Sequence, residues 1–482
     1  MVYVSHTKIA AKVRIKSILW LCFLKKSPFV GIRENSFGIF YYFCRLNRRA
    51  SRREDIYLYQ TNNKNTNKNT DIMELISRRV STMAPSETLA MTQIARELKE
   101  SGKDVISLSI GEPDFNTPEE VKEAAKQAID ENWTHYPPVA GYPELKKAIC
   151  AKFKRDNNLD YTPDQIVVST GAKQSIYQVM MALVNPGDEV VIPAPFWVSY
   201  KAIVQLAEGK SVYIQTQIEN DFKVTPEQLR AAITPKTKVL IFSSPSNPTG
   251  MLYSRDELKA LAEVLREYPD IIVVADEIYE HINFEGKHES MAQFDWMKER
   301  VVTVNGVAKG FAMTGWRIGF IGAPLAIAKA CNKLQGQVTS ATCSIAQRAT
   351  IKAMEMDPAT SEDIINMRNI FMKRRDMVYE LLQQVPGFKV RLPKGAFYFF
   401  PEVCSLYGKN APANSVFAEK YGKTVIENST DLCMYLLYDA NVALVQGIAF
   451  GDDRCIRLSY ATSEDKLKEA VRRIKEAVEN LR

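Results

Sequence analysis

Wholly apolar segments recur along this chain and constrain its fold more than any other feature. Four of them are KVLIFSS (238–244), IIVVAD (271–276), VVTVNG (301–306) and IGFIGA (318–323). A strand that exposes one face alternates apolar and polar residues, so a run without alternation indicates a strand covered on both faces. Between two of these runs, RDELKALAEVLREY (255–268) has the spacing of an amphipathic helix. The pattern predicts an α/β fold in which helices cover a mostly parallel sheet.

Strands and helices also alternate in the preceding part of the chain. We predict a helix over LAMTQIARELKESG (89–102), a strand over VISLSIG (105–111), and a helix that Thr117 and Pro118 open and that ends near residue 131. The strand QIVVST (165–170) leads into a helix beginning at the glycine of GAKQ, where the periodicity changes from extended to helical. After the turn NPGD, the segment EVVIPA predicts a further strand.

The C-terminal part of the chain has a different character. A long helical segment (361–385) precedes three strand-like segments (389–403, 441–451 and 455–462), and a helix (463–481) follows them. This grouping indicates a smaller α+β unit beside the large α/β domain. The expected divisions are a leader (1–72), an N-terminal arm with part of the small domain (73–119), the large domain (120–370) and the small domain (371–482).

The first 72 residues carry most of the positive charge. They contain 14 Lys and Arg against 4 Asp and Glu, a net charge of +10, so the remainder carries −3 of the overall +7. The stretch ends in the low-complexity run QTNNKNTNKNT (60–70), which Met73 follows closely. We expect a disordered or non-native leader, and an organelle transit peptide is the second interpretation because acidic residues are few. The basic character is therefore no argument that the main body binds nucleic acid.

Membrane and DNA partners are disfavoured by the same stretch. Its apolar runs (18–24 and 37–44) are too short to span a bilayer. A DNA-binding regulator would need a compact helix-turn-helix there, whereas Pro28, Gly31 and Gly38 interrupt the sequence. We therefore expect small-molecule partners, and neither nucleic acid nor a membrane.

The eight cysteines form no CxxC pair and have no regular spacing. This arrangement suits free thiols in a reducing compartment better than a disulfide framework or a zinc site. We expect a cytoplasmic protein without a metal, with organelle import as the alternative if the leader is a transit peptide.

Lys309 lies in the segment VNGVAKGFAMTGWRIG (304–319), which carries the strongest chemical signal. Its amine can form a Schiff base, and Arg317 can bind a phosphate dianion. These are the two anchors that pyridoxal phosphate requires, although a surface lysine near a buried arginine would look the same. Polar residues also follow other predicted strands, as GAK, SNPTG and DEIY, where ligands of parallel sheets bind.

Nine segments resemble the motifs of one known family, and they follow one another in the same order as in that family. They are SLSIGEPDFNTP, HYPPVAGYPELKKAI, STGAKQ, APFWVSY, SSPSNPTG, VADEIYE, VAKGFAMTGWRIG, PKGAFYFF and IRLSYA. The chain over residues 73–482 resembles the fold-type I, class I pyridoxal phosphate aminotransferases, and most closely the bacterial-type aspartate aminotransferases. A large cofactor-binding domain and a small domain are the fold that this resemblance implies.

The resemblance implies a role for each polar residue around the pyridine ring. Lys309 would bind the cofactor covalently and, once displaced by substrate, move a proton as the general base. Asp276 would pair with the protonated pyridine nitrogen, which relieves the cost of burying a carboxylate. Tyr279 and Asn247 would donate hydrogen bonds to the phenolic oxygen, and Trp197 would stack on the ring. Trp197 and Asn247 would also border the substrate.

The cofactor phosphate would lie at a helix N-terminus. Gly171, Ala172 and Lys173 open that helix, where free backbone N–H groups attract anions, and Arg317 adds a positive charge. In the family, Tyr136 would reach the phosphate of the neighbouring subunit. The resemblance therefore implies a homodimer with shared active sites.

Substrate residues also follow from the resemblance. Arg457 would bind the α-carboxylate as a bidentate pair, close to the backbone of Gly111. Lys173, with Ser86 and Thr88, would bind a distal carboxylate. A monocarboxylic substrate would leave that cation unpaired, so the expected reaction is transfer of the amino group from L-aspartate to 2-oxoglutarate, giving oxaloacetate and L-glutamate.

Four positions depart from the family pattern. Ala84 stands where relatives that accept prephenate have a basic residue, Gln446 replaces a proline, and Ala308 and Gly306 stand where serines are frequent. Prephenate is therefore disfavoured as a substrate, and cofactor affinity is in question. An aminotransferase for an aromatic amino acid or alanine, or a pyridoxal phosphate β-lyase on the same scaffold, remains the alternative.

Overall fold

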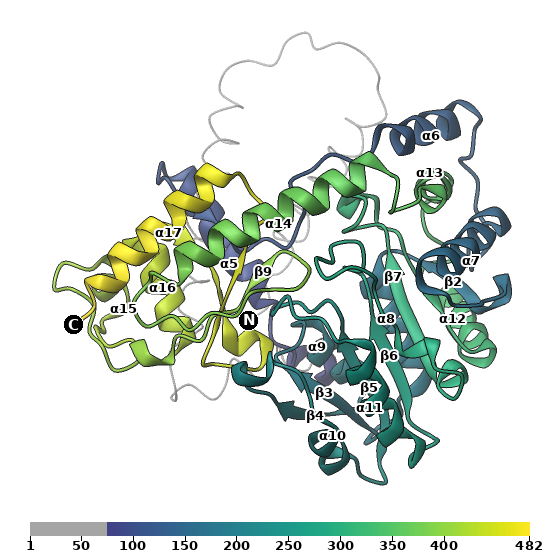
Figure 1. The fold of residues 1–482 in the computed structure, drawn as a ribbon, viewed down its shortest axis with the longest axis horizontal. Helices are drawn as coiled ribbons and strands as arrows, with labels where there is room; N and C mark the ends of the chain where they lie inside the picture. Colours follow the sequence, from purple (N-terminus) through teal and green to yellow (C-terminus); the bar gives the residue numbers. More distant parts are fainter. Residues whose placement is uncertain (1–74) are drawn as a thin grey trace, which may run out of the picture. The chain divides into compact units, whose positions relative to one another are not determined.

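The computed structural model describes residues 75–482, of which Arg78–Arg482 form one compact unit (Figure 1). The predicted leader and Met73 lie outside the described residues. Among the helices of residues 75–482, none is both long enough and apolar enough to cross a membrane. The short helix α4 (Arg78–Ser81) opens the compact unit.

A seven-stranded sheet forms the centre of the larger part, in the order β2-β8-β7-β6-β5-β3-β4. Its strands are β2 (Ile166–Ser169), β3 (Glu189–Ala194), β4 (Lys210–Gln215), β5 (Thr237–Ser243), β6 (Ile272–Asp276), β7 (Val301–Gly306) and β8 (Gly319–Gly322). Neighbouring strands are parallel except for β8, which runs antiparallel to β2 and β7. The prediction of a mostly parallel sheet is confirmed.

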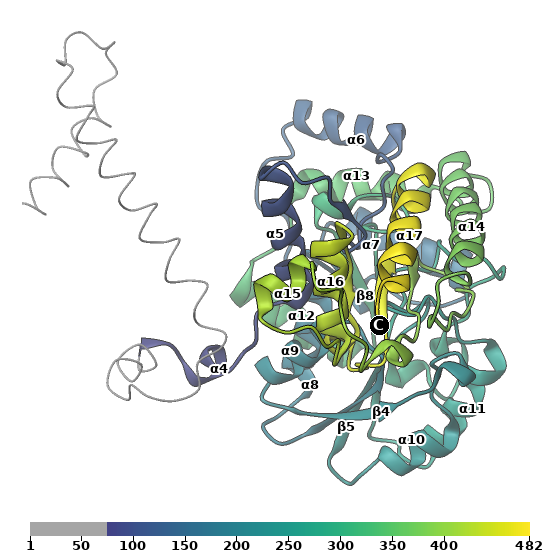
Figure 2. The same cartoon turned by 90° about the vertical axis from the view of Figure 1, so that its left-hand side faces the viewer.

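Helices cover both faces of this sheet, as the apolar runs require. One face packs against α6 (Glu119–Asp130), α7 (Pro143–Asn157), α10 (Pro226–Ala232), α11 (Arg255–Arg266) and α13 (Ser344–Glu355); the other packs against α8 (Ala172–Leu183), α9 (Ser199–Leu206) and α12 (Leu325–Val338). In β5, Leu240 and Phe242 enter the first core, whereas Val239 and Ile241 enter the second. Figure 2 shows α10 and α11 beside β4 and β5.

Strand β4 was not predicted. Its sequence KSVYIQ contains three polar residues, and only Ile214 is fully buried. It pairs with β3 alone, at the edge of the sheet, so half of its surface meets solvent. A search for continuous apolar runs finds central strands and misses such an edge strand.

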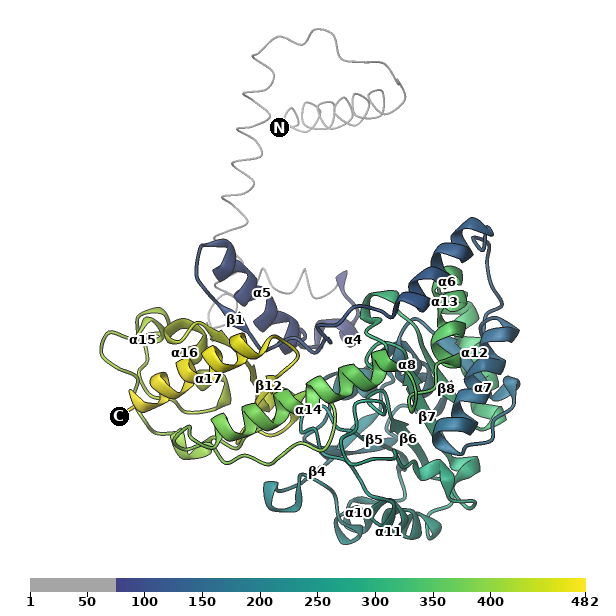
Figure 3. The ribbon, with the colours of Figure 1, turned by 45° about the horizontal axis from the view of Figure 1, so that its top comes forward.

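The remaining elements form a second group around their own core. They are α5 (Glu87–Glu100), β1 (Ile106–Ser107), α14 (Glu362–Leu382), β9 (Tyr398–Phe399), α15 (Val416–Tyr421), α16 (Ser429–Asp439), β10 (Val442–Ala443), β11 (Val445–Gln446), β12 (Ile456–Ser459) and α17 (Glu464–Glu479). Helix α14 joins the two parts, because Ile364 belongs to the core of the large sheet and Phe371 to the second core (Figures 1 and 3). A smaller α+β part therefore accompanies the large α/β part, while the exact domain boundaries stay predictions.

The strands of this second group are shorter than the sequence predicts. The segment 105–111 contributes only the two residues of β1, and 389–403 only the two of β9. Beyond β1, the carbonyl of Ser109 accepts a hydrogen bond from Arg457 and that of Gly111 accepts one from Lys309. The backbone here bonds to functional side chains in place of a neighbouring strand, which ends the ladder.

Thr117 does not cap α6, contrary to the prediction. Pro118 occupies the N-cap position, and no side chain caps this helix. The Thr117 hydroxyl instead donates to the Ala312 carbonyl at 2.9 Å and accepts from the Trp316 indole at 3.1 Å. It thus ties the start of α6 to the loop that carries Arg317.

Candidate active site

A cavity of about 570 Å³ opens where the large sheet meets the second group of elements. Asn247, Asp276 and Lys309 reach it from the carboxyl ends of β5, β6 and β7. Arg317 precedes β8, and because β8 is antiparallel, the start of β8 lies at the same edge as the ends of its neighbours. The position follows the general rule for ligands of parallel sheets.

Most of the predicted site residues line this cavity. They are Thr88, Gly111, Ala172, Lys173, Trp197, Asn247, Asp276, Tyr279, Lys309, Arg317 and Arg457. Three predicted residues lie outside it. Ser86 bonds to Thr88 through their hydroxyls at 3.1 Å, Gly171 lies behind Arg317, and Tyr136 is 95% exposed.

Lys309 lines the cavity. Its Nζ donates to the Gly111 carbonyl at 2.5 Å and lies 5.7 Å from the centre of the Tyr279 ring. Burial lowers the pKa of Lys309 to about 8. Near neutral pH a useful fraction of this amine is therefore unprotonated and able to attack a carbonyl carbon.

Asp276 offers a buried carboxylate to the same cavity. Its side chain is 4% exposed, accepts a hydrogen bond from the Tyr200 hydroxyl at 2.7 Å, and lies 3.4 Å from the Ile278 N–H. Burial raises the pKa of Asp276 to about 6. A carboxylate held at this cost is suited to stabilise a cationic ligand group, such as a protonated pyridine nitrogen.

Asp276→Asn is expected to stabilise the cofactor-free protein at neutral pH. The wild-type pKa rises from 3.8 to about 6 on folding, so stability falls as pH rises through this window, and above it the cost is about 2–3 kcal/mol. The asparagine has no such cost. Urea unfolding at pH 7.5 should show the gain, which should shrink as the pH approaches 4; equal stability at pH 7.5 would contradict the assignment.

The N-terminus of α8 and Arg317 together form an anion site. Gly171, with φ of 83°, precedes the helix, and a Cβ there would lie 2.3 Å from the Arg317 guanidinium. A Cβ on Gly319 would lie 2.2 Å from the Ala172 nitrogen. Both glycines are therefore required for close approach. Burial and the neighbouring Arg317 lower the pKa of Lys173. Free N–H groups beside the Arg317 guanidinium fit a phosphate group.

Arg457 also lines the cavity and is only 3% exposed. Its guanidinium donates to Asn247 Oδ1 at 3.0 Å and to the Ser109 carbonyl at 2.6 Å, and packs between the rings of Tyr398 and Phe450. No carboxylate pairs with it within the described part of the chain, and its Nε has no hydrogen-bond partner there. A buried guanidinium without a counterion suits a ligand carboxylate.

Sequence reasoning missed several residues in the wall of the cavity and one, Tyr200, that supports the wall from behind through Asp276. Tyr200 holds Asp276, and the Tyr398 hydroxyl bonds to the Tyr279 hydroxyl at 2.8 Å. Thr314 also bonds to Glu112 at the margin of the cavity. Tyr200 and Tyr398 lie within the quoted segments APFWVSY and PKGAFYFF, but an isolated aromatic residue gives no signal that separates packing from ligand contact.

The structure explains one departure from the family pattern. A Cβ on Gly306 would lie 2.9 Å from both the Gly319 Cα and the Ile318 carbonyl. A serine there would therefore force the backbone of β8 outward. Ala308 faces the cavity with only a methyl group, so backbone N–H groups and Arg317 have to supply the phosphate contacts.

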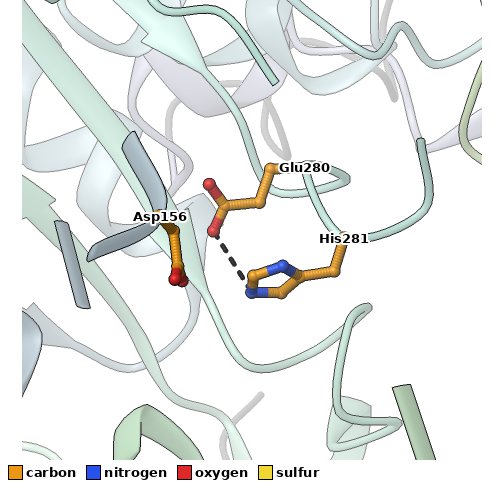
Figure 4. Close-up of side chains that lie close together, drawn as sticks. All are labelled: Asp156, Glu280 and His281. Atoms are coloured by element: carbon orange, nitrogen blue, oxygen red, sulfur yellow. Dashed lines mark ion pairs between the residues drawn. The ribbon is translucent and has the colours of Figure 1, made fainter. Parts of the chain in front are cut away.

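A buried ion-pair cluster supports the segment that carries Asp276 and Tyr279 (Figure 4). Glu280 pairs with Lys152 and with His281 at 3.3 Å, and Lys152 lies 3.7 Å from Asp156. The carboxylate and imidazole atoms of this group lie within 4.8 Å of one another, a spacing that a metal ion could use. Lys152 already pairs with Glu280, and Arg155 pairs with Asp156 at 2.5 Å, so each carboxylate has its own cation and we interpret the group as an ion-pair cluster.

The model of the aminotransferase class I and II family matches residues 103–474. The probable aspartate/prephenate aminotransferase of Rickettsia bellii is 47% identical over 412 residues, covering 85% of this chain and 100% of its own. The crystal structure of the aspartate aminotransferase from Rhizobium meliloti matches with 44% identity and a TM-score of 0.80, over 84% of this chain and 99% of its own.

A further solved structure is the aspartate aminotransferase from Thermus thermophilus with maleate. It is 40% identical, with a TM-score of 0.77, over 83% of this chain and 99% of its own. Pyridoxal phosphate is the cofactor of this family, and the cavity has the buried acid, lysine and anion site that it needs. This chain belongs to the class I and II aminotransferases.

Proposed function

We propose that this aminotransferase transfers the amino group of L-aspartate to 2-oxoglutarate. The observation that carries the proposal is the distribution of charge in one cavity. Arg457 from β12 and Lys173 from the first turn of α8 both line this cavity. Lys309 and Asp276 line it as well. Two separate cations suit a substrate with two carboxylates, one on each side of the reacting carbon. The relatives named above as aspartate aminotransferases support the same substrate.

In this reaction, each of the polar residues around the cavity has its own task. Pyridoxal phosphate, when bound, supplies an aldehyde that condenses with amines and a ring that accepts electrons from the substrate Cα. Asp276 keeps the proton on the pyridine nitrogen, and Arg317 with the start of α8 binds the phosphate. Tyr279 and Asn247, which line the same cavity, would donate hydrogen bonds to the phenolic oxygen. The Lys309 amine moves the proton from the substrate Cα, because the fall of its pKa to about 8 suits a general base.

The Rickettsia bellii relative is named a probable aspartate/prephenate aminotransferase, yet we do not assign prephenate as a substrate of this chain. Ala84 carries no charge, and it does not line the cavity. Thr88 and Lys173 do line it, and they are the groups that we assign to a distal carboxylate. The Lys173 Nζ lies 5.1 Å from the centre of the Trp197 ring, so aromatic packing orients it.

Lys173→Ala is expected to raise the KM for L-aspartate about tenfold to a hundredfold, because the distal carboxylate loses its charged partner. L-Alanine has no distal carboxylate, so its kcat/KM should change much less. Steady-state assays with both donors measure the ratio. Unchanged turnover of aspartate would remove the distal-carboxylate assignment.

The first test of the function is an absorbance spectrum of the purified protein with pyridoxal phosphate. L-Aspartate should shift the visible cofactor band to the near-ultraviolet, and 2-oxoglutarate should restore it, as a ping-pong reaction requires. A band that ignores aspartate but responds to alanine or an aromatic amino acid would assign a different substrate. Release of pyruvate or ammonia would indicate a β-lyase instead.

We also propose a homodimer with shared active sites. Tyr136 is 95% exposed in the single chain and makes no contact with its own cavity, which suits a residue that reaches the cofactor of a partner subunit. Sedimentation analysis tests the assembly, and a monomer with full activity would contradict it. The cytoplasmic location stays a prediction.

A further inference from the structure

Gln446 makes a contact that a proline at this position could not make. Its side-chain Nε2 donates to Glu87 Oε2 at 2.9 Å, between residues 359 positions apart in the sequence. Glu87 is the first residue of α5, and Gln446 ends β11. The Gln446 Oε1 atom is buried and has no hydrogen-bond partner within residues 75–482. The side chain is therefore held by the one bond to α5.

This bond joins the helix that carries Thr88 to the strand that pairs with the strand of Arg457. Strand β11 pairs with β12, where Val445 lies opposite Arg457 and Gln446 opposite Ile456. At the other end, Glu87 immediately precedes Thr88, whose hydroxyl bonds to Ser86 and whose side chain lines the cavity. The Gln446–Glu87 bond therefore fixes the first turn of α5 relative to the strand that presents Arg457.

We propose that Gln446 is a positioning residue for dicarboxylic substrates, acting through Glu87 to hold Thr88 at a set distance from Arg457. The inference rests on the proposed function, because it assigns Thr88 to the distal carboxylate. A substrate with two carboxylates contacts both Arg457 and Thr88, so its binding depends on the distance between these two residues. A monocarboxylic substrate contacts only Arg457. Loss of the bond should therefore weaken binding of the dicarboxylate and leave the chemical step unchanged.

The variants are Gln446→Ala, Gln446→Glu, and the exchange Gln446→Glu with Glu87→Gln. The first removes the bond, the second sets two carboxylates against each other, and the exchange restores a donor opposite a carboxylate. Gln93→Ala is the matched control, because Gln93 donates to Glu97 at 2.8 Å on the exposed side of the same helix. The measurements are KM and kcat for L-aspartate, and the Kd of maleate as a four-carbon dicarboxylate that does not react.

Gln446→Ala should raise the KM for aspartate and the Kd of maleate about fivefold, with kcat within about twofold of the wild type. Gln446→Glu should have a larger effect, and the exchange should bring both constants back to within about twofold. Gln93→Ala should change neither. Wild-type constants in Gln446→Ala, or an exchange that rescues nothing, would overturn the proposal.

Hydrogen exchange of the Ala90 amide, which donates to the Ser86 carbonyl at 3.0 Å and closes the first turn of α5, gives a measurement independent of substrate. It should be faster in Gln446→Ala and normal after the exchange of the two residues. If the enzyme ignores aspartate, the proposed function fails, and the exchange rates still decide whether Gln446 holds α5. Unchanged exchange rates in Gln446→Ala would overturn the positioning role even if aspartate is the substrate.

Discussion

Lys309→Ala is expected to reduce kcat for transamination at least about 10⁴-fold, the upper range for loss of a general base. In the proposed mechanism, the alanine removes both the amine that would bind the cofactor covalently and the group that would move the proton at the substrate Cα. Its methyl group leaves the Gly111 carbonyl without the donor that Lys309 supplies at 2.5 Å. Single-turnover kinetics with L-aspartate measure the loss in the chemical step.

Two controls separate this effect from misfolding. Lys352→Ala removes an exposed lysine that pairs with Glu120 at 2.8 Å, and it should keep full activity. Reduction with borohydride followed by mass spectrometry should label a peptide containing Lys309 in the wild type, and the label should be absent from the variant. Activity within tenfold of the wild type in Lys309→Ala would refute the catalytic role.

Lys152→Met is expected to destabilise the protein by about 3–5 kcal/mol, because Glu280 would remain buried without its cation. Lys152 is 1% exposed and donates to Asn157 at 2.6 Å, and Asn157 donates to Glu280 at 2.7 Å. Burial alone would raise the pKa of Glu280, yet the Lys152 ammonium, with smaller contributions from the nearby imidazoles, holds it below its ordinary value. Urea unfolding measures the change.

Lys154→Met is the matched control on the same helix. Lys154 pairs with Asp160 at 2.9 Å, but both side chains are more than half exposed, so the loss should be below about 1 kcal/mol. Adding Glu280→Gln to Lys152→Met should recover much of the stability, since the unpaired charge is then removed. Equal losses in the two lysine variants would show that the buried cluster of Figure 4 carries no special stability.

The sequence was sufficient for the main elements of the large sheet. Strands such as β5 and β6 are apolar on both faces, and this local pattern needs no knowledge of neighbours. Edge strand β4 was not predicted, because its half-exposed residues have a composition that also occurs in loops and helices. The assignment of Thr117 as a cap failed for a related reason. Its hydroxyl bonds to Ala312, 195 positions away, and a capping motif considers only adjacent residues.

Some residues of the candidate site could likewise be placed from the sequence, and others could not. Asn247, Asp276 and Lys309 could be placed together from sequence, because each follows a strand of one parallel sheet and such strands end at a common edge. Arg317 joins them only because β8 reverses direction, which the apolar run IGFIGA does not reveal. Tyr200 bonds to Asp276, and Tyr398 bonds to Tyr279, only because the folded chain brings these distant residues together.

By itself the sequence therefore determined the fold class, the family and the polar residues that end the central strands, since these depend on local periodicity and on motifs in order. Only the tertiary structure decided which distant side chains meet. The bond between Gln446 and Glu87 and the bond between Asn157 and Glu280 join residues 359 and 123 positions apart. Such contacts depend on the packing of whole elements, and no local pattern of residues encodes a distance between them.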